Sequence, residues 1–100
     1  MSGVPDSWIA TPEPVTVEVM GVSLQVKELT ADEYIDLVAT ATAGERFDGK
    51  RYTAELIRRM VVDPALDPAA LKPGIRAALV RRLETMLGIS PDALKNWMPE

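Results

Sequence analysis

The fold of this 100-residue chain is decided where an alternating segment runs into a helix start, in the stretch Val26-Lys27-Glu28-Leu29-Thr30-Ala31-Asp32-Glu33-Tyr34-Ile35-Asp36-Leu37. Thr30 precedes the helical pattern, and Glu33 follows three residues later. At that spacing the Thr30 hydroxyl accepts a hydrogen bond from the third helical N–H, and the Glu33 carboxylate accepts one from the N–H of Thr30. The stretch therefore predicts a helix that begins at Ala31 behind a capping box.

Upstream of this stretch, apolar residues alternate over residues 15–20 and again over residues 22–26, with Gly21 between them. A period of two on both sides of a glycine predicts a β-hairpin, which we place over residues 15–28. An isolated hairpin is marginal in water, so we expect a helix to cover it or a neighbouring subunit to extend it. An uncovered strand edge would be a place for oligomerisation. The side chains expected to face the core are Val15, Val17, Val19, Val22, Leu24 and Val26.

Downstream of the stretch, helical periodicity predicts about four short helices. Apolar residues recur at helical spacing on one face of each, and glycines follow two of them, at Gly44 and Gly88. Asp63 and Asp67 each place a cap acceptor directly before a proline, which predicts short helical turns at these positions. The predicted helices span residues 31–42, 53–62, 75–87 and 91–97.

The segment Gly44–Lys50, between the first two predicted helices, contains two glycines and four charged residues. This composition predicts a mobile loop in which the aromatic side chain of Phe47 acts as a plug. The whole pattern predicts an α+β fold, in which an N-terminal β-hairpin packs on a small helical bundle. We expect a single domain over residues 15–98, because a chain of this size builds one modest core.

Residues 1–14 contain three prolines and little periodicity, which predicts an extended arm. Trp8 and Ile9 are the large apolar residues of this arm. Each would gain roughly 1.5 to 3 kcal/mol on burial, so the pair either folds back onto the core or docks into another molecule.

Composition excludes most enzyme designs. The chain has no cysteine and no histidine, which removes disulfides, thiol nucleophiles, zinc fingers and imidazole catalysis. It also has no glycine-rich phosphate loop, and no serine stands in the Gly-x-Ser-x-Gly turn of a hydrolase. We therefore expect no enzyme activity, no cofactor and no metal site. The apolar runs are far shorter than the roughly 20 residues that cross a bilayer, so we expect a soluble, cytoplasmic protein with no membrane partner.

The charge is unevenly distributed. Residues 1–50 carry nine acids and three bases, a net charge of −6, whereas residues 51–100 carry six acids and eight bases, a net charge of +2. We expect the two halves to attract each other. The overall net charge of −4 argues against nucleic acid as a partner, because phosphate binding needs a concentrated basic face. A weaker alternative remains a helical regulator that binds nucleic acid through Arg76, Arg81 and Arg82.

Three segments in order carry a resemblance to a known family. They are Leu24–Tyr34 with its capped helix start, Tyr52–Ile57 and Val61–Leu66. Their order and spacing, over roughly residues 15–88, resemble the XkdN-like group of phage tail assembly chaperones. The resemblance implies an assembly factor of a phage or prophage that works in the cytoplasm of the bacterial host cell. It also implies that the chain binds the tape measure protein and keeps it soluble during tail morphogenesis, with a longer frameshifted form of itself and further copies of itself as possible partners.

The apolar faces of the second and third predicted helices offer candidates for such protein–protein contacts. Methionine suits a groove that must accept several partner shapes, although core filling is the commoner reason for its presence. The runner-up function is a small structural virion subunit, such as a connector or tail-completion protein, that assembles into a ring. The candidate partner-binding residues are Trp8, Leu56, Met60, Leu83 and Met86.

Overall fold

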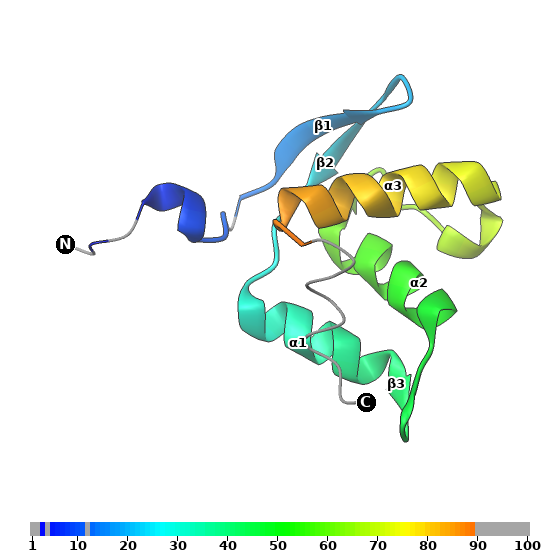
Figure 1. The fold of residues 1–100 in the computed structure, drawn as a ribbon. Coiled ribbons are helices and arrows are strands. Elements are labelled where there is room, and N and C mark those ends of the chain that lie inside the picture. Colours follow the sequence, from blue (N-terminus) through cyan, green and yellow to red (C-terminus); the bar gives the residue numbers. More distant parts are fainter. Residues whose placement is uncertain (1–2, 4, 12, 90–100) are drawn as a thin grey trace.

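The fold is seen in a computed structural model, which describes residues 3, 5–11 and 13–89 (Figure 1). A β-hairpin of β1 (Val15–Val19) and β2 (Val22–Val26) forms the N-terminal part of the domain, as predicted. The strand β5 (Val61–Asp63) adds to β2, giving a three-stranded antiparallel sheet in the order β1-β2-β5. The mixed α and β content confirms the predicted class.

The hairpin turn consists of Met20 and Gly21, both with positive φ, at 50° and 83°. Two consecutive positive φ angles in a two-residue loop define the type I′ turn, whose twist matches that of the paired strands. Gly21 adopts this conformation without steric cost, whereas Met20 has a Cβ that disfavours it. The turn projects from the domain (Figure 1). Of the predicted core residues, Val22 beside the turn is 54% exposed and Val15 at the other end of the hairpin is 41% exposed, so the prediction that these two are buried is wrong. Val17 and Leu24, paired in mid-hairpin, are buried.

The first helix, α1 (Ala31–Thr40), begins with the predicted capping box. The backbone N–H of Glu33 donates to the Thr30 hydroxyl at 3.2 Å, and the N–H of Thr30 donates to the Glu33 carboxylate at 2.8 Å. The helix ends two residues before the predicted boundary at 42, because Thr42 pairs with Phe47 instead.

The predicted loop between the first two helices contains a second small hairpin. Its strands are β3 (Thr42–Ala43) and β4 (Arg46–Phe47), and the Phe47 ring lies 5.3 Å from that of Tyr52. The carboxylate of Asp48 then accepts hydrogen bonds from the N–H groups of the next helix, α2 (Gly49–Met60). The predicted start of this helix at 53 is therefore wrong by one turn, because Asp48 supplies an earlier cap.

The chain directly after α2 differs from the prediction. The last predicted helical residues, Val61 and Val62, belong to β5, and Asp63 ends this strand rather than capping a turn. The second predicted cap is confirmed, because the Asp67 side chain accepts from the Ala69 N–H at the 3₁₀ helix η2 (Pro68–Ala70).

The last described helix is α3 (Pro73–Met86), with Pro73 at its first position, where a proline costs no hydrogen bond. The predicted span of 75–87 therefore starts two residues too late and ends one residue too late. The described part thus contains three α-helices. The prediction of about four is confirmed only in part, and the predicted helix 91–97 lies outside the described residues.

One hydrophobic core joins the hairpin, the three α-helices and β5. None of the described helices is long and apolar enough to cross a membrane. The buried apolar side chains are Val17, Leu24, Val26, Leu29, Tyr34, Leu37, Ala41, Tyr52, Leu56, Ile57, Met60, Val61, Leu79, Val80 and Leu83.

The described part of the arm contains a single 3₁₀ turn, η1 (Asp6–Trp8). Trp8 is 74% exposed and Ile9 is 61% exposed, so neither side chain folds back onto the core. The arm is tied to the domain further along, where the N–H of Thr11 donates to the Glu28 carboxylate at 2.8 Å. The alternative in which Trp8 and Ile9 fold back onto the core is therefore wrong. The other alternative, in which they dock into another molecule, stays a prediction.

Candidate partner-binding site

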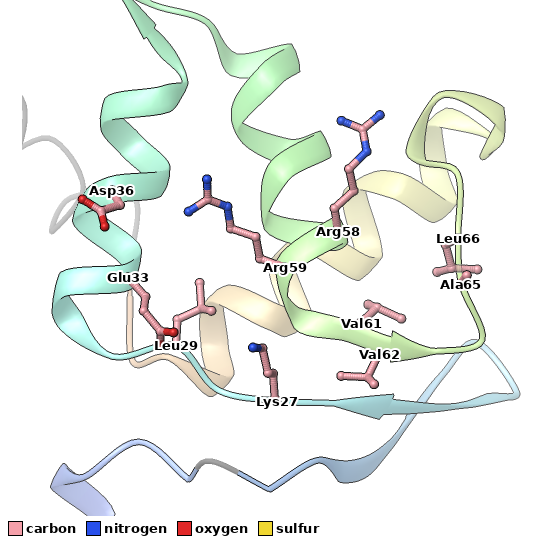
Figure 2. A pocket seen from close by; sticks show the side chains of 10 residues that line it. All are labelled: Lys27, Leu29, Glu33, Asp36, Arg58, Arg59, Val61, Val62, Ala65 and Leu66. Atoms are coloured by element: carbon pink, nitrogen blue, oxygen red, sulfur yellow. The ribbon is translucent and has the colours of Figure 1, made fainter.

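A hollow of about 780 Å³ opens between α1, the end of α2 and β5 (Figure 2). It has five apolar and five charged lining residues. Three of the charged ones are cations, and the two acids both come from α1. The apolar residues are Leu29, Val61, Val62, Ala65 and Leu66, and the charged residues are Lys27, Arg58, Arg59, Glu33 and Asp36.

The hollow forms because α2 and β2 end beside each other. The N–H of Lys27 donates to the carbonyl of Met60 at 2.9 Å, which ties the end of β2 to the last residue of α2. The chain then turns directly from α2 into β5, where an irregular pairing with β2 leaves Val62 49% exposed. An exposed valine therefore lies beside Lys27 among the residues that line the hollow (Figure 2).

Arg58 and Arg59 share a single carboxylate. Arg58 Nη1 lies 3.4 Å from Glu55 Oε2, and Arg59 Nε lies 3.3 Å from Glu55 Oε1. Ion pairs at this degree of exposure contribute only about 0 to 1 kcal/mol, so both guanidinium groups stay available to another anion. Arg59 also points toward α1, where its Nη2 donates to the Thr40 hydroxyl at 3.4 Å (Figure 2).

The acids of the hollow lie on the opposite side, on α1. The hydrogen bond from the backbone N–H of Thr30 lowers the pKa of the Glu33 carboxyl, which keeps it ionised and held in the capping box. The cations that line the hollow are Lys27, Arg58 and Arg59. Such an arrangement can hold an apolar side chain next to a carboxylate of the same partner.

The predicted partner-binding residues do not come together at this hollow. Leu56, Met60 and Leu83 have no exposed surface and pack the core, where they meet other parts of the domain instead of a partner. Met86 is half-buried against the same core. Trp8 is exposed on the arm. Helical periodicity identifies which residues are apolar on one face, and in this small domain that face is the core.

Sequence reasoning missed the apolar residues that line the hollow. Val62 and Leu66 were expected in a helix end and in the turn after it, where neither has a distinctive pattern. The signal that could have found them is the run Val61-Val62, because two adjacent β-branched residues favour a strand over a helix end.

The arginines of the nucleic-acid alternative have different surroundings. The Arg76 guanidinium joins α3 to α2, because it donates to the Thr53 hydroxyl at 2.6 Å and to the Lys50 carbonyl at 2.7 Å. It also donates to the Pro68 carbonyl at 3.2 Å. Arg76 is therefore a structural clamp, whereas Arg81 and Arg82 are exposed on α3.

One buried polar cluster links all three α-helices. Tyr52 donates a hydrogen bond to Glu84 at 2.8 Å, and the Tyr34 hydroxyl lies 2.8 Å from that of Tyr52. Burial raises the pKa of both tyrosines, most strongly that of Tyr52. Both hydroxyls therefore stay protonated and give no general base. Among the described residues, no group of three or more acidic side chains is placed to hold a metal ion.

Comparison with known proteins gave no match to this chain among protein-family models, curated proteins or solved structures.

Proposed function

We propose that this protein is a tail assembly chaperone of a long-tailed phage or prophage, which acts in the cytoplasm of the host cell. Its partner is the tape measure protein, which it keeps soluble until the tail tube polymerises. The observation that carries this proposal is the hollow between α1, α2 and β5, in which exposed apolar side chains adjoin three cations (Figure 2). The order of the three resembling segments supports the same family.

The chemistry of the hollow suits an amphipathic helix. Such a helix places apolar residues along one stripe and charged residues beside it, and it docks by laying the stripe into a groove. Val62 and Leu66 would meet the stripe, while Arg58 and Lys27 would meet carboxylates that flank it. A long helix of this kind aggregates when its stripe is exposed, so many weakly bound copies can keep it soluble through their combined binding.

The test is co-expression with the long helical protein encoded nearest to this gene, followed by affinity capture and size-exclusion chromatography. The variant Val62→Asp places a charge among the apolar lining residues, and we expect it to weaken the complex about tenfold or more, because a buried valine contributes roughly 1.5 to 3 kcal/mol. The matched control is Ile35→Asp, because Ile35 on α1 is 51% exposed and does not line the hollow.

Retained binding of Ile35→Asp with lost binding of Val62→Asp would support the proposal. No complex with the unmodified chain, or equal effects of the two substitutions, would contradict it. Circular dichroism of both variants would show that each is folded.

The second candidate function is a structural virion subunit that forms a ring. The hairpin turn favours it, because Met20 is 67% exposed at a tip that projects from the domain (Figure 1). Apolar projections of this kind are common in interfaces between subunits. The same chromatography separates the two functions, since a ring subunit would form a discrete, stable oligomer without any partner protein.

A further inference from the structure

The outer edge of β1 is open along its whole length. In a two-residue hairpin the pair next to the turn, Val19 and Val22, exchanges both hydrogen bonds, and hydrogen-bonded pairs then alternate along the strands. The backbone groups of Thr16 and Glu18 therefore point away from β2. No other described residue hydrogen-bonds to these outward groups.

This edge lacks most of the usual protection against pairing. Natural sheets guard their edges with charged side chains, lysine above all, with proline, a bulge or a covering segment. The five residues of β1 include neither proline nor lysine, their pairing with β2 is regular, and Glu18 is their single charged residue. The arm does not cover the edge either, because Thr11 is hydrogen-bonded to Glu28, beyond the end of β2.

We propose that β1 pairs with β1 of a second copy of this chain, antiparallel and about a two-fold axis at Val17. The two three-stranded sheets then form one six-stranded sheet across the dimer. Because the axis is perpendicular to the sheet, the helices of both copies lie on the same face of it.

The register follows from the residues of the edge. With Thr16 opposite Glu18 of the second copy, four backbone hydrogen bonds form and no like charges meet. With Thr16 opposite Thr16 of the second copy, Glu18 faces Pro14, which has no N–H to donate. With Glu18 opposite Glu18 of the second copy, two carboxylates are adjacent, and Thr16 faces Met20 in the turn. Only the first register satisfies all the outward groups.

The side chains of this register are also compatible with one another. On the core side, Val17 meets Val17 of the second copy, and Val15, which is 41% exposed in the single chain, meets Val19 of the second copy. On the outer side, the Thr16 hydroxyl lies beside the Glu18 carboxylate of the second copy, a favourable polar pair. The pairing therefore covers exposed apolar surface without burying an unpaired charge.

Cysteine cross-linking tests the register, because the chain has no cysteine of its own. Variants Thr16→Cys and Glu18→Cys are prepared separately, mixed and oxidised. Hydrogen-bonded neighbours have Cα atoms about 5.5 Å apart, within disulfide range, whereas two copies of the same position would be roughly 8 Å apart, outside it. We expect clearly more disulfide formation in the mixture than in either variant alone. Equal cross-linking in all three samples would overturn the register.

Sedimentation equilibrium of a second pair of variants tests the interface itself. Thr16→Pro removes an N–H that the single chain does not use and that the dimer does, and proline is accepted at outward edge positions. Thr16→Val keeps this N–H and is the matched control. We expect Thr16→Pro to raise the dimer dissociation constant about tenfold or more, through the loss of two of four hydrogen bonds. The proposal would be overturned if the unmodified chain were monomeric. It would also be overturned if a folded Thr16→Pro variant had the same dimer dissociation constant as Thr16→Val.

Discussion

At the scale of single residues, Tyr52 connects the three helices of the core. It lies on α2, it donates its only hydroxyl proton to Glu84 on α3, and Tyr34 on α1 must therefore be the donor between the two tyrosines. The two rings meet edge to face, with centroids 6.1 Å apart. A buried hydrogen bond contributes about 1 kcal/mol net, but leaving a buried partner unpaired costs about 1 to 3 kcal/mol.

Replacing Tyr52 by phenylalanine removes the donor to Glu84 and the acceptor of Tyr34 at once. We expect Tyr52→Phe to lower the free energy of unfolding by about 2 to 3 kcal/mol, and Tyr34→Phe by about 1 kcal/mol. Urea unfolding followed by circular dichroism measures both. Equal losses in the two variants would show that the bond to Glu84 contributes little.

The raised pKa values of the two tyrosines predict a loss of stability in alkali. Above the ordinary tyrosine pKa of about 10 the unfolded chain releases protons that the folded chain retains, so the free energy of unfolding falls as pH rises. The fall is about 1.4 kcal/mol per pH unit for each tyrosine held protonated, and the stabilisation is fully present below pH 10. The chain has only these two tyrosines, so tyrosinate absorbance should appear together with unfolding. Absorbance that rises before the circular dichroism signal falls would contradict this expectation.

At the scale of elements, local chemistry was predictable and long-range pairing was not. The capping box at Thr30 and the hairpin around Gly21 were both confirmed, because each depends on residues within a few positions of one another. The strand β5 was missed, because it forms only where the chain meets β2, more than thirty residues earlier. The hollow was missed for the same reason, since β5 provides part of its lining.

The capping box gives a prediction at this scale. Thr30→Ala removes the acceptor for the Glu33 N–H, and we expect it to lower the free energy of unfolding by about 1 kcal/mol. Thr30→Ser keeps the hydroxyl and is the matched control, with an expected change within about 0.5 kcal/mol. Chemical denaturation measures both variants. A serine variant as unstable as the alanine variant would exclude capping as the cause.

At the scale of the whole molecule, the uneven charge of the sequence forms no direct ion pair between the two halves among the described residues. Within the described residues both ion pairs lie inside α2, between Glu55 and the neighbouring arginines. No described side chain of the acidic half therefore forms an ion pair with a described side chain of the basic half. The domain is instead held by its common apolar core and by hydrogen bonds such as those of Arg76. Surface charge remains available for partners.

The exposed Trp8 gives a prediction for the whole assembly. In a Trp97→Phe variant, Trp8 is the only tryptophan, and its 74% exposure predicts strong quenching of its fluorescence by iodide. If the arm docks on a partner, the quenching constant should fall severalfold in the complex, because burial excludes the ion. Unchanged quenching in a complex of proven stoichiometry would show that the arm does not take part in binding.

The hairpin turn also exposes one methionine of a purified sample to oxidation. Met20 is exposed at the tip, whereas Met60 is enclosed in the core, so peroxide reaches Met20 before Met60. Oxidation turns its thioether into a polar sulfoxide, which methionine sulfoxide reductases can reverse. The domain keeps its packing, because the Met20 side chain is not part of the core. Storage in air would therefore change what the tip can adhere to while leaving the thermal melting curve as it was.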